Sequence, residues 1–116
     1  MKLKIKISKS FRKASKPLIK KYDSFASDLK KLEEELEKNP KLGSPIGRNA
    51  YKIRLRIESK NKGKSGGARV ISYLEIVGIL EEEKQTNVTL IMIYDKSERE
   101  AISDSELKFL IENIEI

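Results

Sequence analysis

The sequence has 116 residues, which fits one domain with one core. Apolar residues make up 38% of it, and 25 Lys and Arg against 18 Asp and Glu give a net charge of +7. Because His and Cys are both absent, the chain cannot form a disulfide, a zinc site with thiolate or imidazole ligands, a cysteine nucleophile or a Ser-His-Asp triad.

The chain carries no pattern of a membrane or export segment. No stretch approaches the roughly 18 consecutive apolar residues of a membrane-spanning helix. The basic residues 1–11 contain alternating rather than continuous apolar side chains, which is not typical of a signal peptide. We therefore expect a soluble cytoplasmic protein that does not interact with a membrane.

The first half of the chain predicts one strand and a helical hairpin. Residues 2–8 alternate between apolar and lysine side chains, as in a half-buried strand. Ser10 is the expected N-cap of a helix over residues 11–22, which Pro17 should kink or restart. Asp23 should cap a second helix, which ends before Pro40. Its apolar residues recur at steps of four, three and four: Phe25, Leu29, Leu32 and Leu36. A turn-rich loop over 41–48 follows.

The second half predicts three strands and a helix. Residues 50–58 alternate, residues 68–77 form the next strand, and residues 88–94 are apolar on both faces, as in a central strand. Ser103 and Glu106 fit a capping box that opens the last helix. The buried side of this helix should contain Leu107, Leu110, Ile111 and Ile114. We predict a single α+β domain over 1–116, in the order β-αα-βββ-α. Its small sheet should be mostly antiparallel, with the helices on one face.

Positive charge is concentrated in two segments. Residues 1–23 and 41–69 each have a net charge of +8, whereas 24–40 and 70–116 come to −2 and −7. A local excess of Lys and Arg binds nucleic acid by releasing the counterions of the phosphates. The simpler interpretation, a solvated lysine face, is favoured for 1–23. Polyanion binding is favoured for 48–69, where the basic residues follow the geometry of a strand.

Three successive outward positions of the strand over 50–58 are basic: Lys52, Arg54 and Arg56. Their spacing of about 6.6 Å is close to that of phosphates along one nucleic-acid strand. If the next strand pairs antiparallel, Arg69 lies beside them as an exposed cation, with Tyr73 two positions further on. The connecting loop adds further candidate RNA contacts: Lys60, Lys62 and Lys64. Its glycines, Gly63, Gly66 and Gly67, should let the backbone approach a ligand.

Residues 94–98, YDKSE, follow the predicted central strand. Tyr94, Lys96 and Glu98 could offer a stacking surface, a cation and a proton acceptor, but the string alone favours an ordinary polar turn. The glycine-rich segment GKSGG has neither the Walker A nor the Rossmann spacing, which argues against a nucleotide site.

Over essentially its whole length the sequence resembles the RelE/ParE superfamily of toxins from bacterial type II toxin–antitoxin modules. The segments that carry the resemblance are LEKNPKLGSPIG, NAYKIRLRI, GKSGGARVISY, LIMIYDKSE and ISDSELKFLI. The spacing between GKSGGARV and IYDKSE is closest to the RelE/HigB-like side. The resemblance implies a small α+β fold, cleavage of mRNA on the translating ribosome, and inhibition by a cognate antitoxin protein.

The resemblance also implies roles for individual residues. Arg69 falls where the family has an arginine that contacts the scissile phosphate, and Lys52 and Arg54 match basic positions on the neighbouring strand. The arginine that RelE-type members have after the central strand is replaced here by Ser97. HigB-like members end this strand in a pattern similar to Tyr94, Lys96 and Glu98. ParE-like members, which inhibit DNA gyrase, usually lack the basic set.

The resulting hypothesis is a metal-independent endoribonuclease in which the substrate's own 2′-hydroxyl is the nucleophile. Arg69, Arg54 and Lys52 would stabilise the phosphorane. The candidates for proton transfer are Tyr94, Lys96 and Glu98, or a lysine whose pKa is lowered by its cationic neighbours. No carboxylates recur at a spacing typical of a metal site, and we expect neither a metal nor another cofactor. Two alternatives stay open: a ParE-like gyrase inhibitor without nuclease activity, and a non-enzymatic basic RNA-binding module.

Overall fold

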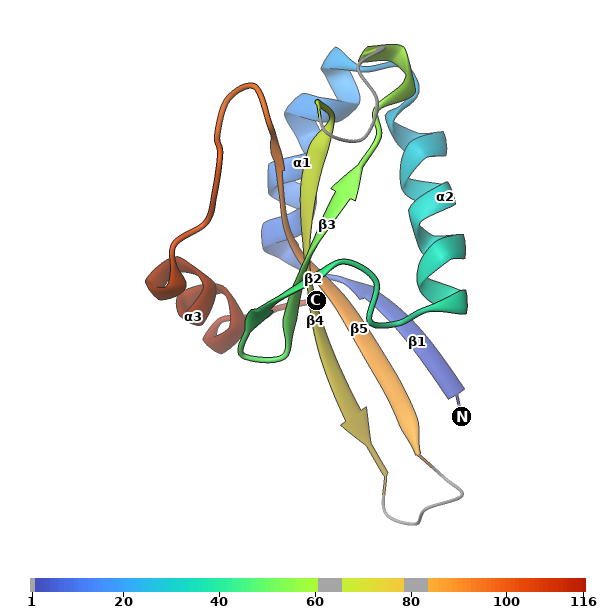
Figure 1. Ribbon diagram of the computed structural model, residues 1–116, viewed down its shortest axis with the longest axis vertical. Helices are drawn as coiled ribbons and strands as arrows, with labels where there is room; N and C mark the ends of the chain where they lie inside the picture. Colours follow the sequence, from blue (N-terminus) through green and yellow to red (C-terminus); the bar gives the residue numbers. More distant parts are fainter. Residues whose placement is uncertain (1, 61–65, 79–83) are drawn as a thin grey trace.

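The computed structural model describes residues 2–60, 66–78 and 84–116. The elements in chain order are β1 (Lys2–Ile7), α1 (Lys9–Lys21), α2 (Phe25–Lys38), β2 (Ser44–Gly47), β3 (Ala50–Leu55), the 3₁₀ helix η1 (Glu58–Lys60), β4 (Ala68–Val77), β5 (Gln85–Asp95) and α3 (Asp104–Glu112). The fold is α+β, with one mixed sheet in the strand order β1-β5-β4-β3-β2 (Figure 1). Within the described ranges, no helix is both long and apolar enough to cross a membrane.

The alternating segments form the strands predicted for them. The apolar segment becomes β5, which lies inside the sheet between β1 and β4. β1 pairs with β5 in parallel, and the other neighbouring pairs are antiparallel, so the sheet is mostly antiparallel as predicted. A parallel pair needs a long connection between its strands. The helical hairpin and the strands that follow it supply that connection between β1 and β5.

β2 was not predicted. It occupies the loop over 41–48 and pairs with β3 as a short edge strand. Pro45 is tolerated there because an edge strand leaves one side of its backbone unpaired. The turn between the two strands contains Gly47, Arg48 and Asn49, all with positive φ. This unusual backbone closes the hairpin directly before β3.

The helix starts also differ from the prediction by one or two residues. Ser8, not Ser10, caps α1, because its hydroxyl accepts a hydrogen bond from the Phe11 amide at 3.1 Å. The Ser10 hydroxyl instead donates to the Ile91 carbonyl of β5 at 2.7 Å. The N-cap of α2 is Ser24 rather than Asp23. The predicted restart at Pro17 does not occur, since α1 is one helix from residue 9 to 21 with Pro17 on its exposed side.

Helices cover both faces of the sheet, which corrects the expectation that all of them pack on one face. The larger core joins α1 and α2 to one face through Phe11, Phe25, Leu32, Leu36, Val70 and Leu90. The smaller core joins α3 to the other face through Leu107, Ile71, Ile91 and Tyr94. Figure 1 shows α3 across the sheet from α2. An amphipathic pattern identifies the buried side of a helix but not which face of a sheet that side meets.

Gly67 allows the backbone to pass close to β3 before β4 begins. A Cβ atom on Gly67 would overlap the Leu55 carbonyl oxygen and would lie 3.1 Å from the Ile57 amide nitrogen. This glycine therefore serves the packing of the protein's own backbone, whereas the sequence had predicted close approach of a ligand. Gly63 lies outside the described residues.

We expect Gly67→Ala to lower the free energy of unfolding by about 1–3 kcal/mol, because the methyl group must push β3 and β4 apart. Urea unfolding followed by circular dichroism measures this change. An unchanged midpoint would contradict the close packing of Gly67 against Leu55.

Candidate nucleic-acid interface

Three strands bring three of the predicted site residues into one row. Arg54 of β3 lies opposite Arg69 of β4, and Arg69 lies opposite Tyr94 of β5. Residues paired across neighbouring strands point to the same face of a sheet. Tyr94 packs in the core beneath α3, so the row lies on the α3 face of the sheet, although Arg54 also lines a pocket with Asp28 and Glu35 of α2. We call Arg54, Arg69 and Tyr94 the cross-strand row.

β3 and the residue that follows it carry two more cations beside Arg54, namely Lys52 and Arg56. Lys52 lies two residues before Arg54 and opposite Ile71 on the same face. Arg54 and Arg56 are exposed and Lys52 is half-buried. Among the described residues these three cations belong to none of the ion pairs, although Glu35 and Glu58 line a pocket with Arg54 and Arg56. Lys52 and Arg54 also line a groove of about 540 Å³ beside β2. These positive charges are therefore available to an anionic ligand.

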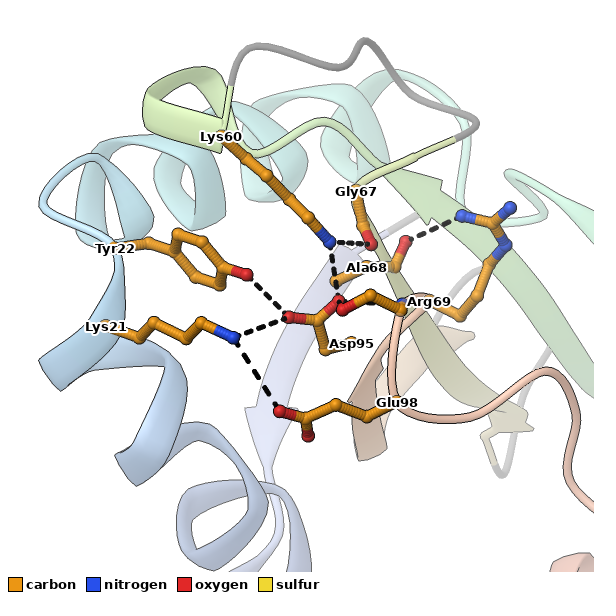
Figure 2. A network of polar contacts seen from close by, with 9 residues as sticks. Lys21, Tyr22, Lys60, Gly67, Ala68, Arg69, Asp95 and Glu98 are labelled. Carbon is orange, nitrogen blue, oxygen red and sulfur yellow. Dashed lines mark hydrogen bonds and ion pairs between the residues drawn. The ribbon is translucent and has the colours of Figure 1, made fainter.

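Arg69 is buried, which corrects the expectation of an exposed strand cation. Only 5% of its surface is accessible, and one guanidinium nitrogen donates to the carbonyl oxygen of Ala68 at 3.2 Å. Its side chain extends away from Asp95, which projects from the other side of the sheet (Figure 2). The Arg69 charge thus acts on the cross-strand row from within the protein, and Arg54 presents the exposed charge of the row.

Tyr94 has a hydroxyl group that is buried and that has no hydrogen-bond partner among the described residues. Burial raises the pKa of the Tyr94 phenol, and the positive charges of Arg69 and Arg99 act in the opposite direction. Arg99 was not predicted as a site residue. Its guanidinium lies 5.4 Å from the centre of the Tyr94 ring, as in a cation–π contact. The same guanidinium forms an ion pair with Glu106 of α3.

On the other face, the buried Asp95 carboxylate collects four hydrogen bonds (Figure 2). One oxygen accepts from the Tyr22 hydroxyl at 2.6 Å. The other accepts from the Lys60 ammonium at 2.5 Å and from the amide and hydroxyl of Ser97 at 2.9 and 2.7 Å. Lys21 lies 4.0 Å from the carboxylate. Asp95 thereby connects the end of α1, η1 and the turn after β5.

The electrostatics of this cluster are those of a structural ion pair. Burial opposes ionisation of Asp95, but the hydrogen bonds from Lys60, Tyr22 and Ser97 outweigh it and hold the pKa of the carboxyl well below its usual range. The Lys60 side chain is only 9% exposed. Lys60 was predicted to contact RNA, but in the structure its ammonium forms an ion pair with Asp95. Sequence patterns do not predict such a contact between residues 35 positions apart.

The remaining predicted residues lie around the cross-strand row rather than in it. The Lys96 ammonium is 4.0 Å from Glu100, and the exposed Glu98 carboxylate is 3.8 Å from Lys21, on the side of α1. Tyr73 is half-buried against the smaller core. Arg56 lies just beyond the end of β3. Lys62 and Lys64 lie outside the described residues.

Two residues at the end of β5 were missed, for different reasons. Asp95 is followed two positions later by Ser97, and an Asp in such a turn commonly accepts hydrogen bonds from the backbone beyond it. This pattern predicts the contact to Ser97 but not those to Tyr22 and Lys60. Arg99 lies in no periodic segment, so no sequence signal places it over Tyr94.

No protein-family model matches the sequence.

We expect Asp95→Asn to lower the free energy of unfolding at neutral pH by about 3 kcal/mol, because it leaves the buried Lys60 ammonium without its charged partner. The carboxyl pKa is depressed in the folded state, so its contribution is fully present above the unfolded value of about 3.9 and is lost as the pH falls toward the folded value. Urea unfolding at about pH 7 and about pH 3 should therefore show a smaller difference between the two proteins at the lower pH. If the two proteins differed in stability by the same amount at both pH values, the Asp95 pKa would not be depressed.

Proposed function

We propose that this protein is the toxin of a type II toxin–antitoxin module, and that it cleaves mRNA on the translating ribosome without a metal cofactor. The cross-strand row of Arg54, Arg69 and Tyr94 is the observation that carries the proposal. It combines two cations and a proton-bearing hydroxyl on one face of the sheet. The resemblance of the sequence to the RelE/HigB-like toxins supports the same conclusion.

In this mechanism the 2′-hydroxyl oxygen of the RNA attacks the adjacent phosphorus, and the bond from phosphorus to the 5′-oxygen breaks. Negative charge develops on the phosphorane oxygens. Preorganised cations that face this charge are usually a large part of catalysis. Arg54 and Lys52 contact the phosphate from the open side, while the buried Arg69 adds its positive charge from within the protein.

Tyr94 is the best supported of the three candidates for proton transfer. It lies in the same row as the two arginines, whereas Glu98 pairs with Lys21 on the side of α1. A phenol is protonated at neutral pH and can therefore act as a general acid; burial raises the pKa of Tyr94, which makes it a weaker acid in the free protein. We infer that Tyr94 donates a proton to the 5′-oxygen as it leaves, after bound RNA has displaced the side chains that bury this hydroxyl in the free protein.

A toxin of this class requires a cognate antitoxin protein. An acidic segment of the antitoxin that covers the Lys52 and Arg54 surface would block access of RNA. Association through these charges would weaken with added salt, since screening reduces the attraction between exposed charges.

We expect Arg54→Ala to lose growth inhibition and to reduce RNA cleavage by at least about 10²-fold, the usual effect of removing one stabilising group. Because Arg54 is exposed, its replacement should change the free energy of unfolding by no more than about 0.5 kcal/mol. Arg12→Ala, which removes an exposed arginine of α1, is the matched control and should stay toxic. Arg69→Ala should lose activity as well, but it should also lower stability because Arg69 is buried.

Inducible expression in bacteria, with mapping of RNA 5′ ends and assay of DNA breaks, measures these effects. DNA breaks without RNA cleavage would favour the gyrase inhibitor. RNA binding without RNA cleavage and without DNA breaks would favour a non-enzymatic binding module. Full activity of Arg54→Ala would remove the cross-strand row from the mechanism.

We expect a single 2′-deoxy substitution at the scissile nucleotide to block cleavage while leaving RNA binding nearly unchanged, since phosphate contacts dominate affinity. The products of unmodified RNA should be a 2′,3′-cyclic phosphate or 3′-phosphate and a 5′-hydroxyl. Minimal RNA at high enzyme concentration allows the reaction to be repeated with EDTA, which should not slow it. A 5′-phosphate on the downstream fragment would mean that water attacks, and the mechanism would be wrong.

A further inference from the structure

Arg99 and Glu106 form a charged contact directly beside the cross-strand row. Arg99 lies in the segment between β5 and α3, and its Nε donates to the Ala101 carbonyl at 2.9 Å. Its terminal nitrogen forms the ion pair with Glu106 while the guanidinium lies over the Tyr94 ring. The two charged side chains are 33% and 32% exposed. Their contact is therefore partly buried, and about a third of each side chain is open to an anion from solvent.

The Tyr94 ring, which lies against the Arg99 guanidinium, carries a hydroxyl with an unused capacity for hydrogen bonding. Tyr94 is 6% exposed, and no described residue is a hydrogen-bond partner of its hydroxyl. A buried polar group without a partner destabilises a protein. The charges that act most strongly on it are those of Arg69 and Arg99. A donor hydroxyl near two guanidinium groups is a suitable environment for an oxyanion such as phosphate.

Glu106, in the first turn of α3, extends its carboxylate toward the Arg99 guanidinium. Its backbone amide donates to the Ser103 hydroxyl at 3.2 Å, which is one half of the predicted capping box. In a complete capping box the glutamate side chain returns to the backbone of the capping residue. Here the Glu106 carboxylate contacts Arg99. It thus presents an oxyanion to the guanidinium, as a phosphate group would.

We propose that Glu106 occupies the position of an RNA phosphate in the free protein, and that RNA displaces its carboxylate from Arg99 and accepts a hydrogen bond from Tyr94. This inference rests on the proposed function, since it assumes that RNA binds along the cross-strand row. It assigns Arg99 as an additional phosphate-binding residue and Glu106 as an autoinhibitory one.

α3 keeps other anchors when Glu106 is displaced. Two nitrogens of Arg48 donate to the two carboxylate oxygens of Asp104, each at 3.0 Å, and connect α3 to the β2–β3 turn. Leu107 stays buried in the smaller core. The exchange therefore requires a change in the side chain of Glu106 rather than loss of the helix.

Binding of a fluorescent 2′-O-methyl RNA, which lacks the attacking hydroxyl, tests the inference without cleavage. Glu106→Gln should tighten binding by about fivefold, since RNA no longer competes with an ion pair. Glu112→Gln is the matched control. It removes one negative charge from the same helix, where Glu112 pairs with Lys108, and it should change binding by less than about twofold.

Two further variants test the roles of Arg99 and Tyr94. Arg99→Ala should weaken binding and should abolish the effect of Glu106→Gln in a double-mutant cycle, because the two residues act through one contact. Tyr94→Phe should raise the melting temperature, since it removes a buried hydroxyl without a partner, and should weaken RNA binding. A purely structural tyrosine would not combine these two effects.

The outcomes separate this inference from the proposed function. If the protein cleaves RNA but Glu106→Gln and Glu112→Gln change binding equally, the autoinhibitory contact is wrong and the nuclease stands. If Glu106→Gln tightens binding selectively but no RNA is cleaved, the autoinhibitory contact stands and the enzymatic function is wrong. A Tyr94→Phe variant that binds RNA as tightly as the unmodified protein would remove the hydroxyl from the phosphate site.

Discussion

The buried carboxylate of Asp95 is the constraint on which the geometry of this protein depends. It holds Tyr22 at the end of α1 and Lys60 of η1, and Ser97 fixes the turn that follows β5. The Gly67 carbonyl accepts hydrogen bonds from the Lys96 amide at 3.1 Å and from the Lys60 ammonium at 3.5 Å. Because the start of β4 is fixed in this way, the register of β4 against β5 is fixed as well. That register sets Arg69 opposite Tyr94.

Alternation along two strands then separates the charges by role. Asp95 pairs across the sheet with Ala68, whereas the preceding residue, Tyr94, pairs with Arg69. Successive residues of a strand point to opposite faces. The ion pair of Asp95 and Lys60 therefore lies on the side of α1 and α2, where hydrogen bonds satisfy it. Arg54 and Lys52 are directed to the side of α3, and at the edge of the sheet they also line a groove with Glu35 of α2. On the first side charge fixes the fold, whereas on the second side it both holds α3, through Arg48 and Arg99, and leaves Arg54 exposed.

This separation explains which features could be predicted from the sequence. The period of two placed Lys52, Arg54 and Arg69 on one face and the apolar residues of β3 on the other, because alternation is a local property. Burial of Arg69 could not be predicted, since alternation gives the face of a residue and not what covers it. The four-residue β2 has too few residues for a pattern and includes Pro45 and Gly47. The contact of Lys60 with Asp95, and that of Arg99 with Glu106 and Tyr94, depend on how separate elements meet.

The two faces of the sheet also differ in what holds their helices. α1 and α2 contribute large, fully buried side chains to the core, including Phe11, Phe25, Leu32 and Leu36. The buried residue of α3 is Leu107, and its other apolar residues are half-buried or exposed, with Phe109 at 64%. Leu110 and Ile111 pack against the smaller core, and two ion pairs, Arg48 with Asp104 and Arg99 with Glu106, add polar contacts to α3. Such ion pairs contribute little to the free energy of unfolding, and salt screens them. Burial of apolar surface contributes more and is not screened by salt. α3 is therefore the helix whose attachment depends most on contacts that salt screens.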